Sequence, residues 1–150
     1  MRKEEARIQM EKLVDDFKRF ENECLKKTFK EASARKLYID KFFEALGWNV
    51  SGEMGVAPES QDVLVEESLD SEGNNKKFVD YTFRILKTTK FMCEAKKPSE
   101  SINNKSYIFQ AKSYAFSQGI PFIILTNFYE MKLFDINTKP LKDKPEIDNI

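Results

Sequence analysis

Histidine is absent from this chain, and several other residue types are scarce. Without histidine, Ser-His and Cys-His catalysis, His-ligated zinc and histidine-based nucleases are all excluded. Two cysteines, Cys24 and Cys93, are too few for a disulfide framework or a thiolate zinc site. None of the five glycines stands in a Gly-x-Gly or P-loop spacing, so these residues contain neither a cofactor-binding methyltransferase nor an ATPase.

Long apolar runs are also lacking. No run could span a bilayer, and the first residues do not have the pattern of a secretory signal peptide. We therefore expect a cytoplasmic location and no membrane partner. The 150 residues, of which 41% are apolar and 13 are phenylalanine, predict one globular domain with a substantial core.

Neither sign of charge is in excess, because 25 Lys and Arg balance 25 Asp and Glu. Zero net charge is unusual for a nucleic-acid-binding protein. The segment 87–112, however, contains six lysines and two glutamates, a local charge of +4 that suits phosphate contact. A solvated surface that happens to be rich in lysine is the alternative, and the sequence leaves it open.

The stretch from Phe78 to Pro98 organises the rest of the chain. Aromatic and β-branched residues predict a strand from Phe78 to Ile85, and a second apolar run predicts another from Lys90 to Ala95. A tight turn near Lys87-Thr88 would join them into a hairpin, although no Asn-Gly or Gly-Gly pair fixes its register.

Three charged residues of this hairpin are expected to converge. Asp80 lies roughly opposite Glu94, and the two-residue period of a strand puts Lys96 on the same face as Glu94. The neighbours of Glu94 are apolar or small, as in a strand covered on both sides, where a charge is costly unless it is solvated, paired or bound to a metal. Acidic oxygens there suit a hard divalent cation. An ion cluster on a solvated strand remains the plainer alternative.

The spacing of these residues resembles a known signature. Asp80, thirteen residues and then Glu94-Ala95-Lys96 is similar to the PD-(D/E)XK nuclease motif, with Val79 in place of the usual proline. Alone, this pattern has many chance matches.

Three further stretches make the resemblance specific. Glu31 to Trp48 is similar to the E-A-x-x-R…F-x-x-A-L-G-W helix that precedes the nuclease core in restriction enzymes. Gln110 to Tyr114 matches the Q-x-x-x-Y motif of helicase-nucleases and restriction proteins, and Phe122 to Asp135 looks like the strand pair that closes the core. The resemblance covers roughly residues 31–140. It is nearest to the N-terminal nuclease domain of Type IIG enzymes, which fuse endonuclease and adenine methyltransferase, and extends to Type I nuclease domains.

The resemblance implies an α/β fold, with a restriction-endonuclease-like mixed β-sheet flanked by α-helices. It also implies Mg²⁺-dependent hydrolysis of DNA, with Mn²⁺ as a substitute cation. Asp80, Glu94 and Lys96 would be catalytic, and Asp80, Glu94 and the Ala95 carbonyl would bind the metal. A methyltransferase and a target-recognition region, fused or associated, would be the partners. The alternative function is a catalytically silent nuclease fold that binds DNA or protein. An RNA-directed or single-strand exonuclease of the same fold is a third possibility that the sequence does not separate.

Accessory roles are implied for three further residues. Gln110 and Tyr114 lie one helical turn apart and would orient the site or touch the DNA backbone. Glu31 has two interpretations that the sequence does not separate. It is either a carboxylate near the metal or a helix N-terminal charge paired with Arg35.

We predict a domain over residues 1–140, with a helical arm at about 1–30 and a linker-like tail over 141–150. The arm is expected to pack on the core. The predicted elements are helices over 2–28 and 31–46, strands over 62–69, 78–85 and 90–95, a helix over 106–118, and strands over 122–126 and 129–135.

Overall fold

The computed structural model describes residues 2–52, 60–65, 79–143 and 145. The helical elements are α1 (Lys3–Arg19), α2 (Glu21–Cys24), α3 (Glu31–Ala34), the π-helical η1 (Arg35–Ile39), α4 (Asp40–Ala45) and α5 (Lys105–Ser117). The strands are β1 (Val63–Val65), β2 (Tyr81–Ile85), β3 (Thr88–Ala95), β4 (Phe122–Thr126) and β5 (Met131–Asp135). The predicted order of helices and strands is confirmed over the described residues.

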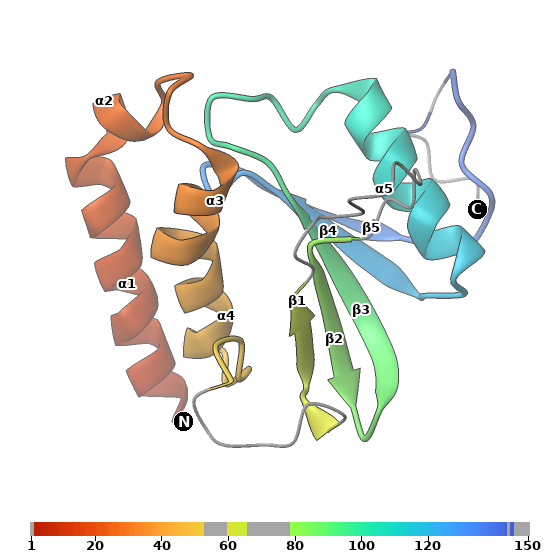
Figure 1. Ribbon diagram of the computed structural model, residues 1–150, viewed down its shortest axis with the longest axis horizontal. Helices are drawn as coiled ribbons and strands as arrows, with labels where there is room; N and C mark the ends of the chain where they lie inside the picture. Colours follow the sequence, from red (N-terminus) through yellow and green to blue (C-terminus); the bar gives the residue numbers. More distant parts are fainter. Residues whose placement is uncertain (1, 53–59, 66–78, 144, 146–150) are drawn as a thin grey trace, which may run out of the picture.

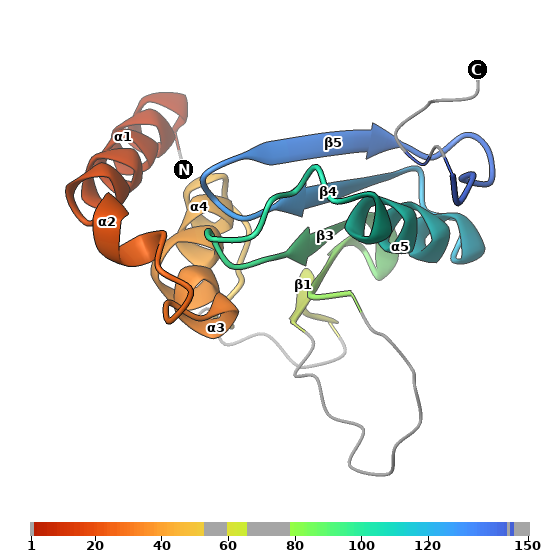
Figure 2. The same ribbon diagram turned by 90° about the horizontal axis from the view of Figure 1, so that it is seen from above.

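The five strands form one sheet in the order β1-β2-β3-β4-β5. Strands β3 and β4 are parallel, whereas every other neighbouring pair is antiparallel. Parallel neighbours need a long crossover connection, and α5 provides it. Helices α1, α3 and α4 lie on one side of the sheet and α5 on the other (Figure 1; seen from above in Figure 2). The prediction of a mixed sheet flanked by helices is therefore confirmed.

Two buried clusters sandwich the sheet, and they differ in composition. The cluster under α5 is mainly aliphatic and includes Ile108, Ile123 and Leu125. The cluster under η1 and α4 is aromatic: the rings of Phe43 and Phe83 lie 4.5 Å apart, centroid to centroid. Successive residues of a strand point to opposite faces, so each central strand contributes to both clusters.

Strand β3 runs through the middle of this sandwich. Met92 belongs to the cluster under α5, and Cys93 and Ala95 belong to the cluster under α4. The prediction that the strand around Glu94 is covered on both sides is confirmed, and the half-buried Glu94 is therefore an acid inside a packed layer.

The hairpin of β2 and β3 turns one residue earlier than predicted. Ile85 pairs with Thr88, so the turn residues are Leu86 and Lys87. Between Phe83 and Arg84 the register shifts, because Phe83 pairs with Phe91 whereas Arg84 pairs with Thr89. This bulge leaves one extra residue on β3 and continues the register of Tyr81 with Cys93, so Asp80 comes opposite Glu94.

The N-terminal arm packs on the core, as predicted, but it is not one helix. It breaks at Phe20, and the short α2 brings the buried Cys24 to Tyr38, whose hydroxyl oxygen lies 3.6 Å from the Cys24 sulfur. Leu13 and Phe17 of α1 join the same cluster. The break brings Cys24 into contact with Tyr38. The prediction of one continuous helix over residues 2–28 did not include this contact.

The second predicted helix is present, with one irregularity. Residues 31–45 are helical in three segments, because η1 widens to π-helical hydrogen bonding between α3 and α4. Gly47 follows with a φ of 100°, as predicted for the residue that ends the helix.

At the C-terminal side, Asn127 to Glu130 form the turn, so β5 begins two residues later than predicted. Ile136 packs against the cluster under α5, and Pro140 and Pro145 are buried. Predicted structure over 53–59, 66–78, 144 and 146–150 lies outside the described residues. Among those described, no helix is long and apolar enough to cross a membrane.

Candidate active site

Asp80 lies at the centre of the candidate site, directly before β2. One carboxylate oxygen accepts a hydrogen bond from the Ala95 backbone N–H at 2.7 Å, which joins Asp80 to the end of β3. The other lies 3.3 Å from the Arg35 guanidinium. The side chains of this ion pair are only 14% and 18% exposed, so the pair is largely shielded from solvent. Both carboxylate oxygens of Asp80 therefore have partners.

Glu94 and Glu31 both lie close to the Asp80 carboxylate. Burial, followed by the charge of Asp80 and a hydrogen bond with it, raises the pKa of Glu94 to about 9. Burial and then the charge of Asp80 raise the pKa of Glu31 to about 7, whereas Lys96 and Arg35 lower it. The cluster thus holds protons near neutral pH, as expected for acids that share too few cations. The structure brings Glu31, from the start of α3, to Asp80 and Glu94.

Lys96 follows β3 and lies on the face of the sheet covered by α5. Its ammonium nitrogen is 4.1 Å from the centroid of the Tyr107 ring, a cation–π distance. The Tyr107 hydroxyl donates a hydrogen bond of 2.6 Å to Glu100. Lys96 also lowers the pKa values of Glu31 and Glu94, which places its charge close to both acids. The ammonium group is therefore positioned by an aromatic ring beside the carboxylates.

Arg35 connects the π-helical turn to β2. Its Nε lies 3.4 Å from the Tyr81 hydroxyl, its guanidinium carbon lies 4.9 Å from the Tyr81 ring centroid, and it bonds the Asp80 backbone carbonyl at 3.5 Å. The Tyr81 hydroxyl in turn donates to Asp40. Burial and then this contact with Asp40 raise the pKa of Tyr81.

The π-helical turn explains how Arg35 and Asp40 both reach Tyr81. They are five residues apart, and in a regular α-helix that spacing leaves them on different faces, roughly 140° apart. The wider η1 turn closes a hydrogen bond from the Asp40 N–H to the Arg35 carbonyl, which brings both side chains to one face. Arg35 thus forms its ion pair with Asp80, whereas the sequence had offered Glu31 as its partner.

The donor chemistry of this cluster fits a hard cation such as Mg²⁺. Buried carboxylates with raised pKa values are stabilised when a divalent cation takes the place of protons. Among the described residues, no group of three or more His, Cys, Asp or Glu side chains is arranged so that it could hold a metal ion. Mg²⁺ needs fewer, because it is usually bound by one or two carboxylates and keeps several waters. Asp80 and Glu94 with the Ala95 carbonyl would supply such a set once Asp80 turned an oxygen away from Arg35.

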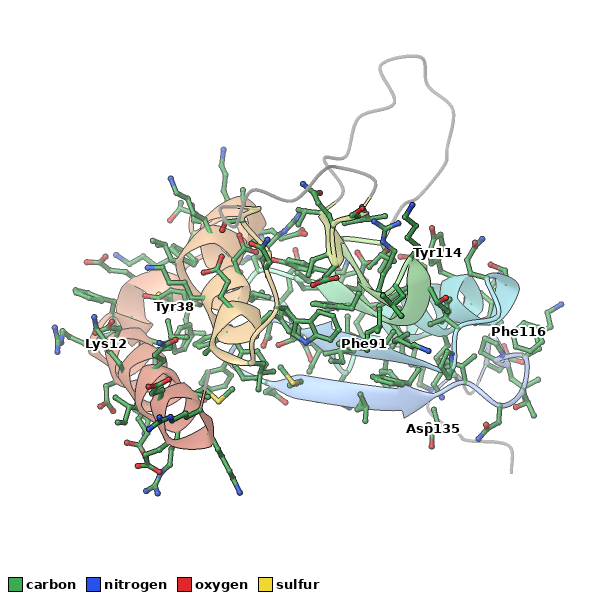
Figure 3. The ribbon with its side chains drawn as sticks, turned by 90° about the horizontal axis from the view of Figure 1, so that it is seen from below. Lys12, Tyr38, Phe91, Tyr114, Phe116 and Asp135 are labelled. Atoms are coloured by element: carbon green, nitrogen blue, oxygen red, sulfur yellow. The ribbon has the colours of Figure 1, made fainter. Side chains whose placement is uncertain are left out.

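The other predicted accessory residues lie on α5, whose buried side packs on the sheet. Tyr114 is half-buried against the aliphatic cluster (labelled in Figure 3), whereas Gln110 is exposed. Tyr107, also on this helix, contacts the candidate catalytic Lys96, and it was not among the predicted site residues. The sequence does contain a signal that places Tyr107 with the predicted accessory residues. Tyr107 precedes Gln110 by three residues and Tyr114 by seven, which is the spacing of one helix face.

Lysines of two separate segments meet near this site. The Lys97 ammonium donates to the Lys27 backbone carbonyl at 3.3 Å and lies 3.8 Å from Glu100. The connection after β3 therefore runs beside the connection between α2 and α3, and both contribute positive charge. Such a surface suits phosphate contact.

Sequence comparison finds a restriction-enzyme relationship. The chain is 31% identical over 143 residues to the Type II restriction enzyme and methyltransferase RM.Eco57I of Escherichia coli. The match covers 94% of this chain and 14% of that protein, so the chain spans about a seventh of the relative's length. No family model matches the chain. No solved structure matches it either.

Proposed function

We propose that this chain is a Mg²⁺-dependent endodeoxyribonuclease domain of the PD-(D/E)XK type, with a restriction-endonuclease-like fold. The observation that carries the proposal is the meeting of Asp80, Glu94 and Lys96 at the adjoining ends of β2 and β3, with Glu31 beside them. Half-buried acids with raised pKa values and a positioned lysine are typical of catalytic sites. The relationship to a restriction enzyme and methyltransferase supports the same conclusion.

Each residue has a separate role in this proposal. Asp80, Glu94 and the Ala95 carbonyl would hold Mg²⁺, which supplies Lewis-acid stabilisation of the phosphate and lowers the pKa of water. Lys96, held against Tyr107, donates hydrogen bonds to the scissile phosphate and stabilises its developing negative charge. Glu31, whose pKa is about 7, is suited to accept a proton from the attacking water at neutral pH. The water oxygen forms a new bond to phosphorus while the bond from phosphorus to the leaving sugar oxygen breaks, and that oxygen takes up a proton from solvent water.

A second function has its own supporting observation. Both oxygens of Asp80 are engaged, one by Arg35 and one by the Ala95 N–H. A catalytically silent fold that binds DNA or protein would use Asp80 in this way, as a structural ion pair. The retention of Glu94 and Lys96 beside it favours catalysis, because a purely structural role for Asp80 does not require a half-buried acid with a pKa of about 9.

The chain itself contains no recognisable target-reading element. We propose that site-specific cutting requires a methyltransferase and recognition region of the kind found in Type IIG enzymes, in a restriction-modification system. Phosphate contacts alone give weak, salt-sensitive binding with a Kd of roughly 10⁻⁴ to 10⁻⁶ M. The 150-residue chain is therefore expected to nick DNA slowly and without sequence preference.

The deciding experiment incubates the chain with supercoiled and linear plasmid in Mg²⁺, Mn²⁺, Ca²⁺ or EDTA. We expect nicking in Mg²⁺ and Mn²⁺ that Lys96→Ala abolishes and that Lys12→Ala, an exposed lysine on α1, leaves unchanged. Isothermal titration with Mn²⁺ gives a second readout, since Asp80→Ala should remove binding. Mn²⁺ binding unchanged by Asp80→Ala, together with no nicking in any metal, would establish the silent alternative.

A further inference from the structure

The turn between β2 and β3 goes against the backbone preference of its residues. Leu86 and Lys87 have φ angles of 50° and 68°, in the left-handed region that suits glycine and asparagine. A two-residue turn with two positive φ angles ordinarily uses Asn-Gly. A leucine in this place costs stability, so its presence calls for a reason.

Packing does not provide that reason. The Leu86 side chain is 92% exposed, and the neighbouring Ile85 is 51% exposed. Neither side chain belongs to a buried cluster. The hairpin therefore presents a bare apolar point to solvent, on a turn that a polar residue would form more easily.

Every charged residue of the hairpin just behind this point is basic. From Tyr81 to Cys93 the sequence has Arg84, Lys87 and Lys90 and no Asp or Glu, a charge of +3 in a chain whose net charge is zero. Lys87 and Lys90 are exposed. Arg84 is anchored, because its guanidinium donates two hydrogen bonds, of 3.1 and 2.6 Å, to the Gln61 carbonyl. An apolar point flanked by cations is complementary to a polyanion that also offers an apolar surface.

The tip and the candidate active site lie at opposite ends of the same hairpin (Figure 1). Thr82 pairs with Met92, and the two-residue period then puts Arg84 and Glu94 on one face of the sheet. Glu94 is the eighth residue after Leu86, a span of roughly 25 Å along a strand. That span equals about seven base pairs of duplex DNA.

We propose that the β2–β3 tip is a second DNA contact, in which Leu86 inserts as an apolar wedge into the minor groove. Lys87 and Lys90 would contact the flanking phosphates while the scissile phosphate lies at Asp80, Glu94 and Lys96. Leucine is one of the side chains that partly unstack a base step and bend the duplex. The proposal rests on the proposed function, because it takes the substrate to be duplex DNA. The wedge would sit about seven base pairs from the cut.

The substitution Leu86→Asn separates this proposal from a structural accident. Asparagine accepts the left-handed backbone, so the variant should melt higher, by roughly 2–4 °C. It also removes the apolar wedge, so affinity for a 30-base-pair duplex should fall about tenfold. The controls are Leu86→Met, which keeps an apolar side chain and should keep the affinity, and Leu141→Asn, an exposed leucine outside regular structure that should change nothing. Binding is measured by fluorescence anisotropy in a Lys96→Ala background, so it is read whether or not the chain cuts DNA.

Two further measurements test the geometry. A 2-aminopurine base in the duplex should brighten on binding wild type and not on binding Leu86→Asn, because the wedge unstacks it. Replacing Lys87 or Lys90 with glutamine should lower the slope of log affinity against log salt by about 0.9 each. A more stable Leu86→Asn variant that binds and brightens like wild type would overturn the proposal. So would capture by phosphatidylserine vesicles that depends on Leu86 while DNA affinity does not.

Discussion

The candidate site has two halves that solve the same electrostatic problem differently. Around Asp80, the Arg35 guanidinium and the Ala95 N–H occupy both carboxylate oxygens. Around Glu94, the charge of Lys96, whose ammonium group lies over the Tyr107 ring, favours ionisation, but the pKa of Glu94 still rises to about 9. The first half is complete as an ion pair, whereas the second needs a proton or a cation.

This difference separates a structural framework, in which Arg35 and the Ala95 N–H hold the proposed ligand Asp80 in place, from a reaction centre around Glu94. A buried acid with matched partners stabilises the native geometry, and removing one partner is costly. A buried acid without a matched cation destabilises the fold when it is ionised, and that cost is acceptable where it serves chemistry. The two halves should therefore respond in opposite directions when their charges are removed.

The largest expected effect is on catalysis by the Glu94 half. Glu94→Gln keeps the shape of the side chain and removes its charge, so DNA nicking should fall about 10³-fold or more, since several kcal/mol of metal-assisted stabilisation is lost. The same substitution should raise the free energy of unfolding above pH 7, because glutamine does not have to take up a proton when the chain folds. Plasmid nicking and urea denaturation measure the two effects. Loss of both activity and stability would instead place Glu94 in the framework, and Glu130→Gln on the exposed β4–β5 turn is the control.

The next effect is on the stability of the Asp80 half. Arg35→Met should lower the free energy of unfolding by about 3 kcal/mol, because it leaves a largely buried carboxylate without its partner. Arg7→Met is the matched control. Arg7 pairs with Glu11 at 2.9 Å, but these side chains are 69% and 61% exposed, and the expected loss is below about 0.5 kcal/mol. Equal losses from the two variants in urea denaturation would contradict the assignment of Arg35 to the framework.

A further effect on stability is expected when pH is varied. Glu94 keeps its proton in the folded state up to about pH 9, and Glu31 up to about pH 7, whereas both ordinarily ionise near 4.5. The folded state thus binds more protons than the unfolded state above pH 4.5. This proton-linked contribution to stability is complete below that pH and is lost as pH rises to about 9.

The pH effect is read as the difference between wild type and Glu94→Gln in urea denaturation from pH 5 to 9. Saturating Mg²⁺ should flatten the wild-type curve, since the cation takes the place of the proton. A wild-type curve parallel to that of the variant throughout the range would show that Glu94 is not the source.

The smallest effect concerns Tyr107. Tyr107→Leu removes the ring beneath the Lys96 ammonium, a contact of about 0.5–1 kcal/mol, so nicking should fall a few-fold while the melting temperature changes little. Tyr107→Phe retains the ring and loses only the hydrogen bond to Glu100, so it should keep most of the activity. If both variants lose activity equally, the hydroxyl and not the ring is what supports Lys96.

The sequence predicted the elements well because most of them are encoded locally. Strand and helix periods placed β2, β3, α5 and β4 within a few residues, and the two-residue period alone put Glu94 and Lys96 on one face. The early turn and the bulge were not predictable in the same way. The early turn moves the pairing of β2 with β3 in one direction, and the bulge moves it back in the other. Asp80 lies opposite Glu94 because both shifts occur.

The contacts that complete the site depend on tertiary packing. Arg35 forms its ion pair with Asp80, 45 residues away in the sequence, because of the way η1 lies against β2. Lys96 meets Tyr107 because α5 crosses the end of β3, a geometry that no local period of the sequence carries. The positive φ angle of Leu86 could not be predicted either, because leucine does not indicate a left-handed turn.

The π-helical turn lets the length of this segment vary without moving the site. Each α-helical residue turns the chain by roughly 100°, so four α-helical residues turn it about as far as the five residues of a π-helical turn. Deleting one residue between Arg35 and Ile39 would let η1 relax into ordinary α-helix and would leave α3 in nearly the same rotation relative to α4. Arg35 and Asp40 would then be four residues apart and would still share a face, and Glu31 would stay beside Asp80. A homologue with a one-residue gap here should therefore keep the accessory acid, whereas the same gap within α4 should displace it.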